Sequence, residues 1–88
     1  MARILVVDDE DGIRKVLRQL LEYEGHEVRA ATSGGEALTV YPEFRPDLVF
    51  LDVKMARMDG LEVLGRLREQ DPSAIVVMRN ASTKPRRV

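Results

Sequence analysis

Residues 4–9 read Ile4-Leu5-Val6-Val7-Asp8-Asp9, four apolar side chains followed directly by two carboxylates. A second apolar run, at residues 48–51, also ends in an acid, Asp52. Continuous apolar runs are typical of parallel strands that are covered on both faces of the sheet. Ligands of such sheets bind outside the carboxyl ends of the strands, where we expect the three acids to meet. Because neighbouring carboxylates repel one another unless a cation lies among them, the pattern predicts a metal site with one carboxylate able to react.

The composition indicates one small soluble domain. The chain has 88 residues, of which 44% are hydrophobic and 33% charged, as in folded globular proteins. No apolar run reaches the ~20 residues that span a bilayer, and the first residues lack the pattern of a signal peptide. Cysteine is absent, which excludes thiolate metal sites and fits a cytoplasmic location.

Charge is distributed unevenly along the chain. All 15 acids lie in residues 1–78, whereas Arg79, Lys84, Arg86 and Arg87 lie in the last ten positions. An acidic body argues against direct nucleic-acid binding by this chain, and contact through an output domain of a longer parent stays open. We therefore expect a folded domain at residues 1–78 and an irregular basic tail at 79–88.

Hydrophobic periodicity alternates between strand and helix. We expect strands at 3–7, 28–31, 48–51 and 74–78, and helices at 12–24, after Thr32-Ser33, and at 60–70. The residues expected to face inward from the helices are Ile13, Val16, Leu17, Leu20 and Leu21, then Ala37, Leu38 and Tyr41, then Leu61, Leu64 and Leu67. This β-α-β-α-β-α-β order with short connections predicts an α/β fold, a parallel sheet with helices on both faces.

Local signals mark the ends of these helices. Asp11 and Asp59 are expected to cap the first and third helices, because a carboxylate accepts hydrogen bonds from the first free N–H groups. Gly25 suits the left-handed turn that ends a helix. Pro42 is expected to end or kink the second helix early.

The acids after the first strand are open to two interpretations. Oxygen ligands suit Mg²⁺, and with its charge neutralised Asp52 could attack a phosphoryl group. Acids that follow a strand also commonly cap the next helix, so Asp8 and Asp9 alone could do only that. The loop at 53–58 separates Asp52 from the next helix, for which Asp59 is the cap. Taken together, the two clusters favour a metal site.

Residues 3–78 resemble the receiver domain of two-component response regulators. The motifs that carry the resemblance are Ile4-Leu5-Val6-Val7-Asp8-Asp9-Glu10, Asp47-Leu48-Val49-Phe50-Leu51-Asp52, Met55, and Asp59-Gly60-Leu61. The resemblance implies a flavodoxin-like doubly wound sheet of strand order 2-1-3-4, and a signalling module rather than an enzyme. It implies that a sensor histidine kinase phosphorylates Asp52.

The resemblance also implies a set of ligands. Asp9 and Asp52 would bind Mg²⁺ directly, Asp8 through water, and Lys54 through its backbone carbonyl. Gly60 would allow a tight turn into the third helix.

The chain departs from the family pattern at its end. Receivers have five βα units, so the final α-β-α elements are lacking here. Asn80 takes the place of a Ser or Thr that contacts the phosphoryl group, and the family's Lys after a fifth strand has no counterpart except, poorly, Lys84. Ala56 replaces the usual proline. We therefore expect a truncated receiver, whose end could be frameshifted or artificial, with impaired phosphoryl acceptance.

Truncation would also leave the fourth strand at the edge of the sheet. Residues 75–78 would then expose apolar surface on both faces and an unpaired backbone row, which favours a homo-oligomer joined through this strand or the tail. Two alternative functions stay open. One is a kinase-docking module without phosphoryl output, and the other is a Mg²⁺-dependent phosphatase.

Overall fold

The computed structural model describes residues 1–53, 55 and 59–79. Four strands form one parallel sheet in the order β2-β1-β3-β4. Their bounds are Arg3–Val7 (β1), Glu27–Ala31 (β2), Leu48–Asp52 (β3) and Val76–Arg79 (β4). The helices are Asp11–Tyr23 (α1), Gly34–Phe44 (α2) and Gly60–Gln70 (α3). The fold class and strand order predicted from the sequence are confirmed.

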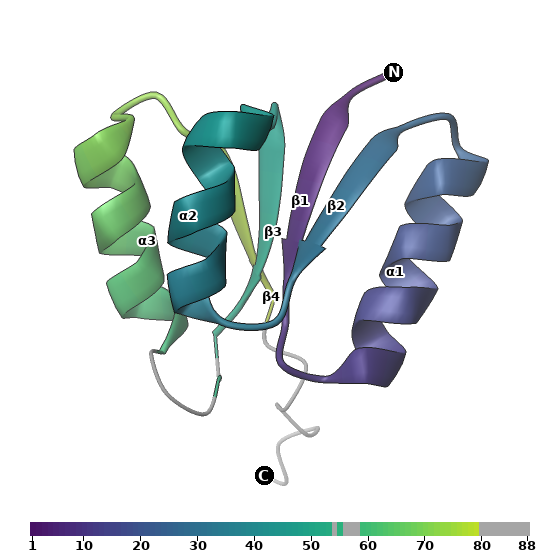
Figure 1. Cartoon of the computed structure of the whole chain (residues 1–88), viewed down its shortest axis with the longest axis horizontal. Helices are drawn as coiled ribbons and strands as arrows, with labels where there is room; N and C mark the ends of the chain where they lie inside the picture. The colour runs from purple at the N-terminus through teal and green to yellow at the C-terminus, as the bar shows by residue number, and fades with distance from the viewer. Residues whose placement is uncertain (54, 56–58, 80–88) are drawn as a thin grey trace, which may run out of the picture.

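The helices cover the two faces of the sheet unequally. Helices α2 and α3 lie side by side on one face, and α1 lies alone on the other (Figure 1). Side chains alternate between the faces along each strand. Leu5 and Val7 therefore join the larger core under α2 and α3, whereas Ile4 and Val6 join a smaller core under α1.

Two of the five residues in the predicted inward stripe of α1 do not face the sheet. Leu17 and Leu21 pack on the smaller core, but Val16 is 53% exposed and Leu20 58% exposed. The prediction was wrong for these two residues, because α1 crosses only β1 and β2 and presents one narrow face to them. In α3, Leu61 is likewise exposed, while Val63 and Leu67 are fully buried. The inward positions predicted for α2 are confirmed by its half-buried Leu38 and its buried Ala37 and Tyr41.

Two of the predicted helix ends differ from the structure. Glu10, not Asp11, occupies the N-cap position of α1, and Asp11 lies in the first turn, where it pairs with Arg14. Acids are favoured in that turn by the helix dipole. Pro42 does not end α2, which continues to Phe44. Burial of the Phe44 ring anchors this last turn, and we infer that it offsets the backbone hydrogen bond that proline cannot donate.

The other predicted ends are confirmed. The Asp59 side chain accepts a hydrogen bond from the Glu62 N–H and caps α3. Gly25 has a positive φ of 91° after α1, and Ser33 caps α2.

Strand β4 begins and ends later than predicted, at Val76 and Arg79 instead of 74 and 78. Arg79 therefore lies in the sheet and not in a tail, since it pairs with Asp52 in the register of β3 and β4. Residues 80–88 of the expected tail lie outside the described residues. Val76 and Met78 pack on the larger core, so β4 exposes one apolar face rather than the two that we expected.

Candidate metal centre

The acidic cluster joins side chains from the ends of two neighbouring strands. Asp8, Asp9 and Asp52 each offer a carboxylate oxygen, and these oxygens lie within 4.8 Å of one another. Asp52 ends β3 and the other two acids follow β1, and the two strands pair with Val7 opposite Leu51. The proximity predicted from the sequence is confirmed.

The donor set fits a hard divalent cation. Asp8 is 1% exposed and Asp52 is 6% exposed, whereas Asp9 is open to solvent. Burying carboxylates together is costly unless positive charge compensates them. Opposite ligands of an octahedral Mg²⁺ are about 4.2 Å apart. Oxygens up to 4.8 Å apart slightly exceed this separation, so they fit an ion that reaches one of the carboxylates through a water.

Both carboxylate oxygens of Asp8 have partners within the chain. Its Oδ1 accepts a hydrogen bond from the Glu10 N–H at 2.9 Å. Its Oδ2 pairs with the guanidinium of Arg79. In addition, Arg14 donates to the Asp8 backbone carbonyl at 2.7 Å. The Glu10 side chain makes no capping hydrogen bond at the start of α1. These contacts orient Asp8 toward the cluster and hold it there.

Arg79 is the residue of this site that the sequence reasoning missed. The expected basic tail begins at this residue, but Arg79 is the last residue of β4, and its carbonyl accepts a hydrogen bond from the Val53 N–H at 2.8 Å. The signal that could have revealed it is its position directly after an apolar run. In a parallel sheet, that position places it at the same edge as Asp8 and Asp52.

Gly60 holds the start of α3 against the end of β3. Its N–H donates to the Val53 carbonyl at 2.8 Å. A Cβ at this position would lie 2.7 Å from the Val53 Cα and would also collide with the Asp52 carbonyl oxygen. Only glycine fits this approach, so the close turn expected at Gly60 is confirmed. Met55 is half-buried and packs on the larger core. Lys54, Ala56, Asn80 and Lys84 lie outside the described residues.

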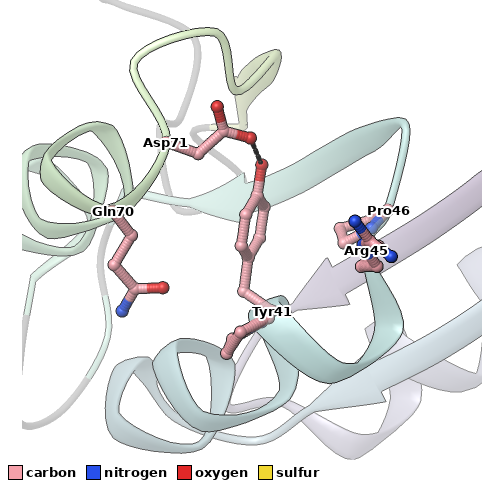
Figure 2. A pocket seen from close by; sticks show the side chains of 6 residues that line it. Tyr41, Arg45, Pro46, Gln70 and Asp71 are labelled. Carbon is pink, nitrogen blue, oxygen red and sulfur yellow. Dashed lines mark hydrogen bonds between the residues drawn. The ribbon is translucent and has the colours of Figure 1, made fainter.

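A separate cavity of about 340 Å³ lies at the opposite end of the sheet, between the carboxyl ends of α2 and α3. Its residues include Tyr41, Arg45 and Asp71 (Figure 2). The Tyr41 hydroxyl donates to the Asp71 carboxylate at 2.8 Å. Burial, followed by this hydrogen bond, raises the pKa of Tyr41 to about 12. This contact is remote from the acidic cluster, and the sequence reasoning did not find it.

Among the described residues, no helix is long and apolar enough to cross a membrane.

Comparisons with known proteins agree with this geometry. The family model of the response regulator receiver domain matches residues 4–87. Sporulation initiation phosphotransferase F of Bacillus subtilis strain 168 is 40% identical over 79 residues, which cover 90% of this chain and 64% of that protein.

Solved structures show the same similarity. The response regulator TrrA of Thermotoga maritima in complex with Mg(2+)-BeF has a TM-score of 0.87 and 43% identity, over 92% of this chain and 70% of that one. TrrA in complex with the histidine kinase ThkA matches with a TM-score of 0.87 and 41% identity, over 100% of this chain and 76% of that one.

The chain thus spans less than two thirds of the length of the sporulation phosphotransferase. The match to the family model nevertheless covers nearly all of its residues, and the strand order and acidic cluster agree with it. The chain belongs to the response regulator receiver domain family of two-component signalling.

Proposed function

We propose that this receiver domain accepts a phosphoryl group on Asp52 from a sensor histidine kinase, in a reaction that requires Mg²⁺. The observation that carries the proposal is the convergence of the Asp8, Asp9 and Asp52 carboxylates within 4.8 Å. In this scheme Asp9 and Asp52 bind the cation directly, Asp8 binds it through water, and the backbone carbonyl of Lys54 completes the protein ligands.

The proposed chemistry is a simple displacement. A carboxylate oxygen of Asp52 attacks the phosphorus, the bond from phosphorus to the kinase histidine nitrogen breaks, and that nitrogen keeps the electron pair. Bound Mg²⁺ would neutralise charge on the phosphoryl oxygens. The burial of Asp52 limits water around the nucleophile, which strengthens electrostatic stabilisation of the transferred group.

Helix α1 offers the surface that we assign to the kinase. Val16, Leu20 and Tyr23 follow the i, i+4, i+7 spacing of one helix face, and they are 53%, 58% and 88% exposed. An apolar stripe of this kind on a helix beside the site suits docking against a partner helix. The complex of TrrA with the kinase ThkA supports a partner of this class. A cytoplasmic location, suggested by the cysteine-free sequence, completes the proposal.

Intact mass spectrometry tests the proposal. Incubation with acetyl phosphate and Mg²⁺ is expected to add one phosphoryl group, and chelation of the metal should prevent it. Asp52→Asn should abolish the adduct. Asp59→Asn is the matched control, because it makes the same chemical change at a helix cap where asparagine serves as well as aspartate. An adduct that persists in Asp52→Asn would refute the assignment.

The same experiment also measures the rate of phosphorylation and tests two other functions. The residue expected to contact the phosphoryl group is Asn80, which has no hydroxyl. We therefore expect slower phosphorylation than in receivers with Ser or Thr there.

The first alternative, a docking module without phosphoryl output, would form no adduct yet still bind the kinase. A Mg²⁺-dependent phosphatase would release inorganic phosphate through many turnovers, whereas the proposed signalling module gains at most one phosphoryl group per chain.

A further inference from the structure

The end of β4 places a positive charge beside Asp8, one of the three acids of the cluster. Asp52 and Arg79 are partners in the register of β3 and β4, and the Arg79 guanidinium pairs with the Oδ2 of Asp8 beyond the end of β1. Strand β3 lies between β1 and β4, so the Arg79 side chain has to cross the end of β3 to reach Asp8. Neighbouring strands are about 4.8 Å apart, so the Arg79 and Asp8 side chains together bridge two strand spacings.

This pair is shielded from solvent more than an ordinary surface ion pair. The Asp8 side chain is 1% exposed and the Arg79 side chain 26% exposed. Charges that are partly buried are screened little by salt. The other oxygen of Asp8 is already hydrogen-bonded to the Glu10 N–H. A cation that binds the Asp8 carboxylate therefore has to share an oxygen with the Arg79 guanidinium or the Glu10 N–H, or displace one of them.

We propose that Arg79 is an internal counter-cation that competes with the divalent metal and weakens its binding to this site. The inference rests on the metal-binding part of the proposed function. Two effects act in the same direction. Arg79 occupies an oxygen that the metal, or its bound water, would use, and its charge repels the incoming dication. Without Arg79, the Asp8 carboxylate would lose the cation that pairs with its Oδ2, and a divalent cation would gain more by binding.

Calorimetric titration with Mg²⁺ at constant ionic strength tests the inference. Arg79→Gln removes the charge while keeping the backbone contacts of β4, and we expect it to bind Mg²⁺ at least about fivefold more tightly than the parent chain, the lower range of coupling between neighbouring sites. Arg68→Gln is the control: it removes the same charge from an exposed position in the last turn of α3, and its affinity should match the parent. Equal affinity in the parent and Arg79→Gln would overturn the inference.

A second variant separates loss of charge from loss of structure. Arg79→Lys keeps a cation on the strand, so its Mg²⁺ affinity should be lower than that of Arg79→Gln. If the two variants bind equally tightly, charge is not the cause and the inference fails. Circular dichroism establishes that each variant is folded.

Asp9→Asn distinguishes failure of this inference from failure of the proposed function. If the parent chain binds Mg²⁺, Asp9→Asn abolishes binding, and Arg79→Gln changes nothing, the metal site stands and only the role of Arg79 is wrong. If neither the parent nor Arg79→Gln binds Mg²⁺, both proposals fail. Binding by Arg79→Gln alone would be the strongest form of the expected result.

Discussion

The hydrogen bond between Tyr41 and Asp71 shows how one partly buried contact makes stability depend on pH. Burial and the nearby carboxylate raise the pKa of Tyr41 to about 12. Hydrogen bonds from Ser73 and then from Tyr41 hold the pKa of Asp71 below its usual value. The two groups therefore favour the folded state over different pH ranges: Asp71 above its unfolded pKa, and Tyr41 below its own.

Alkaline unfolding tests the Tyr41 side of this contact. The unfolded tyrosine ionises near pH 10, whereas the folded one stays neutral up to about pH 12. The Tyr41 contribution to stability is therefore fully present below pH 10 and lost as the pH rises to about 12. Urea unfolding across this range should show a loss of the order of 1 kcal/mol after allowing for solvent near the hydroxyl.

Two variants identify the source of that loss. Tyr41→Phe should lack it, while Tyr23→Phe, at a position that is 88% exposed, should behave like the parent chain. The same alkaline slope in Tyr41→Phe would contradict the assignment.

The contacts of single residues, at the metal centre and at Tyr41, differ in how far the sequence could predict them. Asp8 and Asp52 follow apolar runs, and strand ends in a parallel sheet converge whatever the details of packing. Arg79 meets Asp8 across 71 positions of sequence, and Tyr41 meets Asp71 across 30. Such contacts depend on strand order and on how far each side chain reaches, which local patterns do not encode.

At the scale of elements, the two glycines of α3 differ in whether the surrounding structure leaves room for a side chain. A Cβ at Gly60 would collide with the backbone of Asp52 and Val53, whereas a Cβ at Gly65 would meet no atom within 4 Å. Gly60→Ala should therefore destabilise the fold by about 1–3 kcal/mol, since the backbone has to shift. Gly65→Ala should stabilise it by roughly 0.4–1 kcal/mol through helix propensity and a more restricted unfolded chain.

Chemical denaturation of the two alanine variants measures both effects. Opposite signs within one helix would establish that the close turn after β3, and not helix propensity, governs position 60. A neutral Gly60→Ala would show that the turn can relax, and it would weaken the case that this glycine sets the position of Asp52.

Hydrophobic periodicity predicted that each described helix and strand exists, but it did not predict which side chains of α1 and α3 are buried. The apolar stripe of α1 is wider than the part of the sheet that it covers, so Val16 and Leu20 stay exposed. In α3 the burial of Val63 instead of Leu61 depends on where α2 packs beside it. Helix α2 continues past Pro42 to Phe44, whose ring lies in the larger core, a tertiary contact that the local sequence pattern does not show.

At the scale of the whole molecule, β4 is the outer strand of the sheet in the described part of the chain. Ile75, just before it, is 61% exposed and Val77 is 42% exposed. We propose that two copies of the chain associate through this edge, because exposed apolar edge strands readily pair with another chain. Light scattering during gel filtration should then give a mass above that of the monomer at high protein concentration.

Matched lysine variants test this association. Val77→Lys should weaken it about tenfold or more, because charged side chains on an edge strand oppose pairing. Leu61→Lys is the control, since Leu61 is 66% exposed but lies on α3. A monomeric parent chain at high concentration, or equal effects of the two variants, would exclude this edge as the interface.

Helix α1 contains no fully buried side chain, although it adjoins a strand whose Leu5, Val6 and Val7 are at most 1% exposed. Local opening of α1 should therefore cost much less free energy than global unfolding. Hydrogen–deuterium exchange should replace the amide protons of α1 well before those of β1, and the α1 rates should depend little on low concentrations of urea. Equal protection of the two elements would contradict this expectation. If α1 opens in this way, it can adjust its tilt to whatever docks on its apolar stripe, while the strands that carry the carboxylates stay fixed.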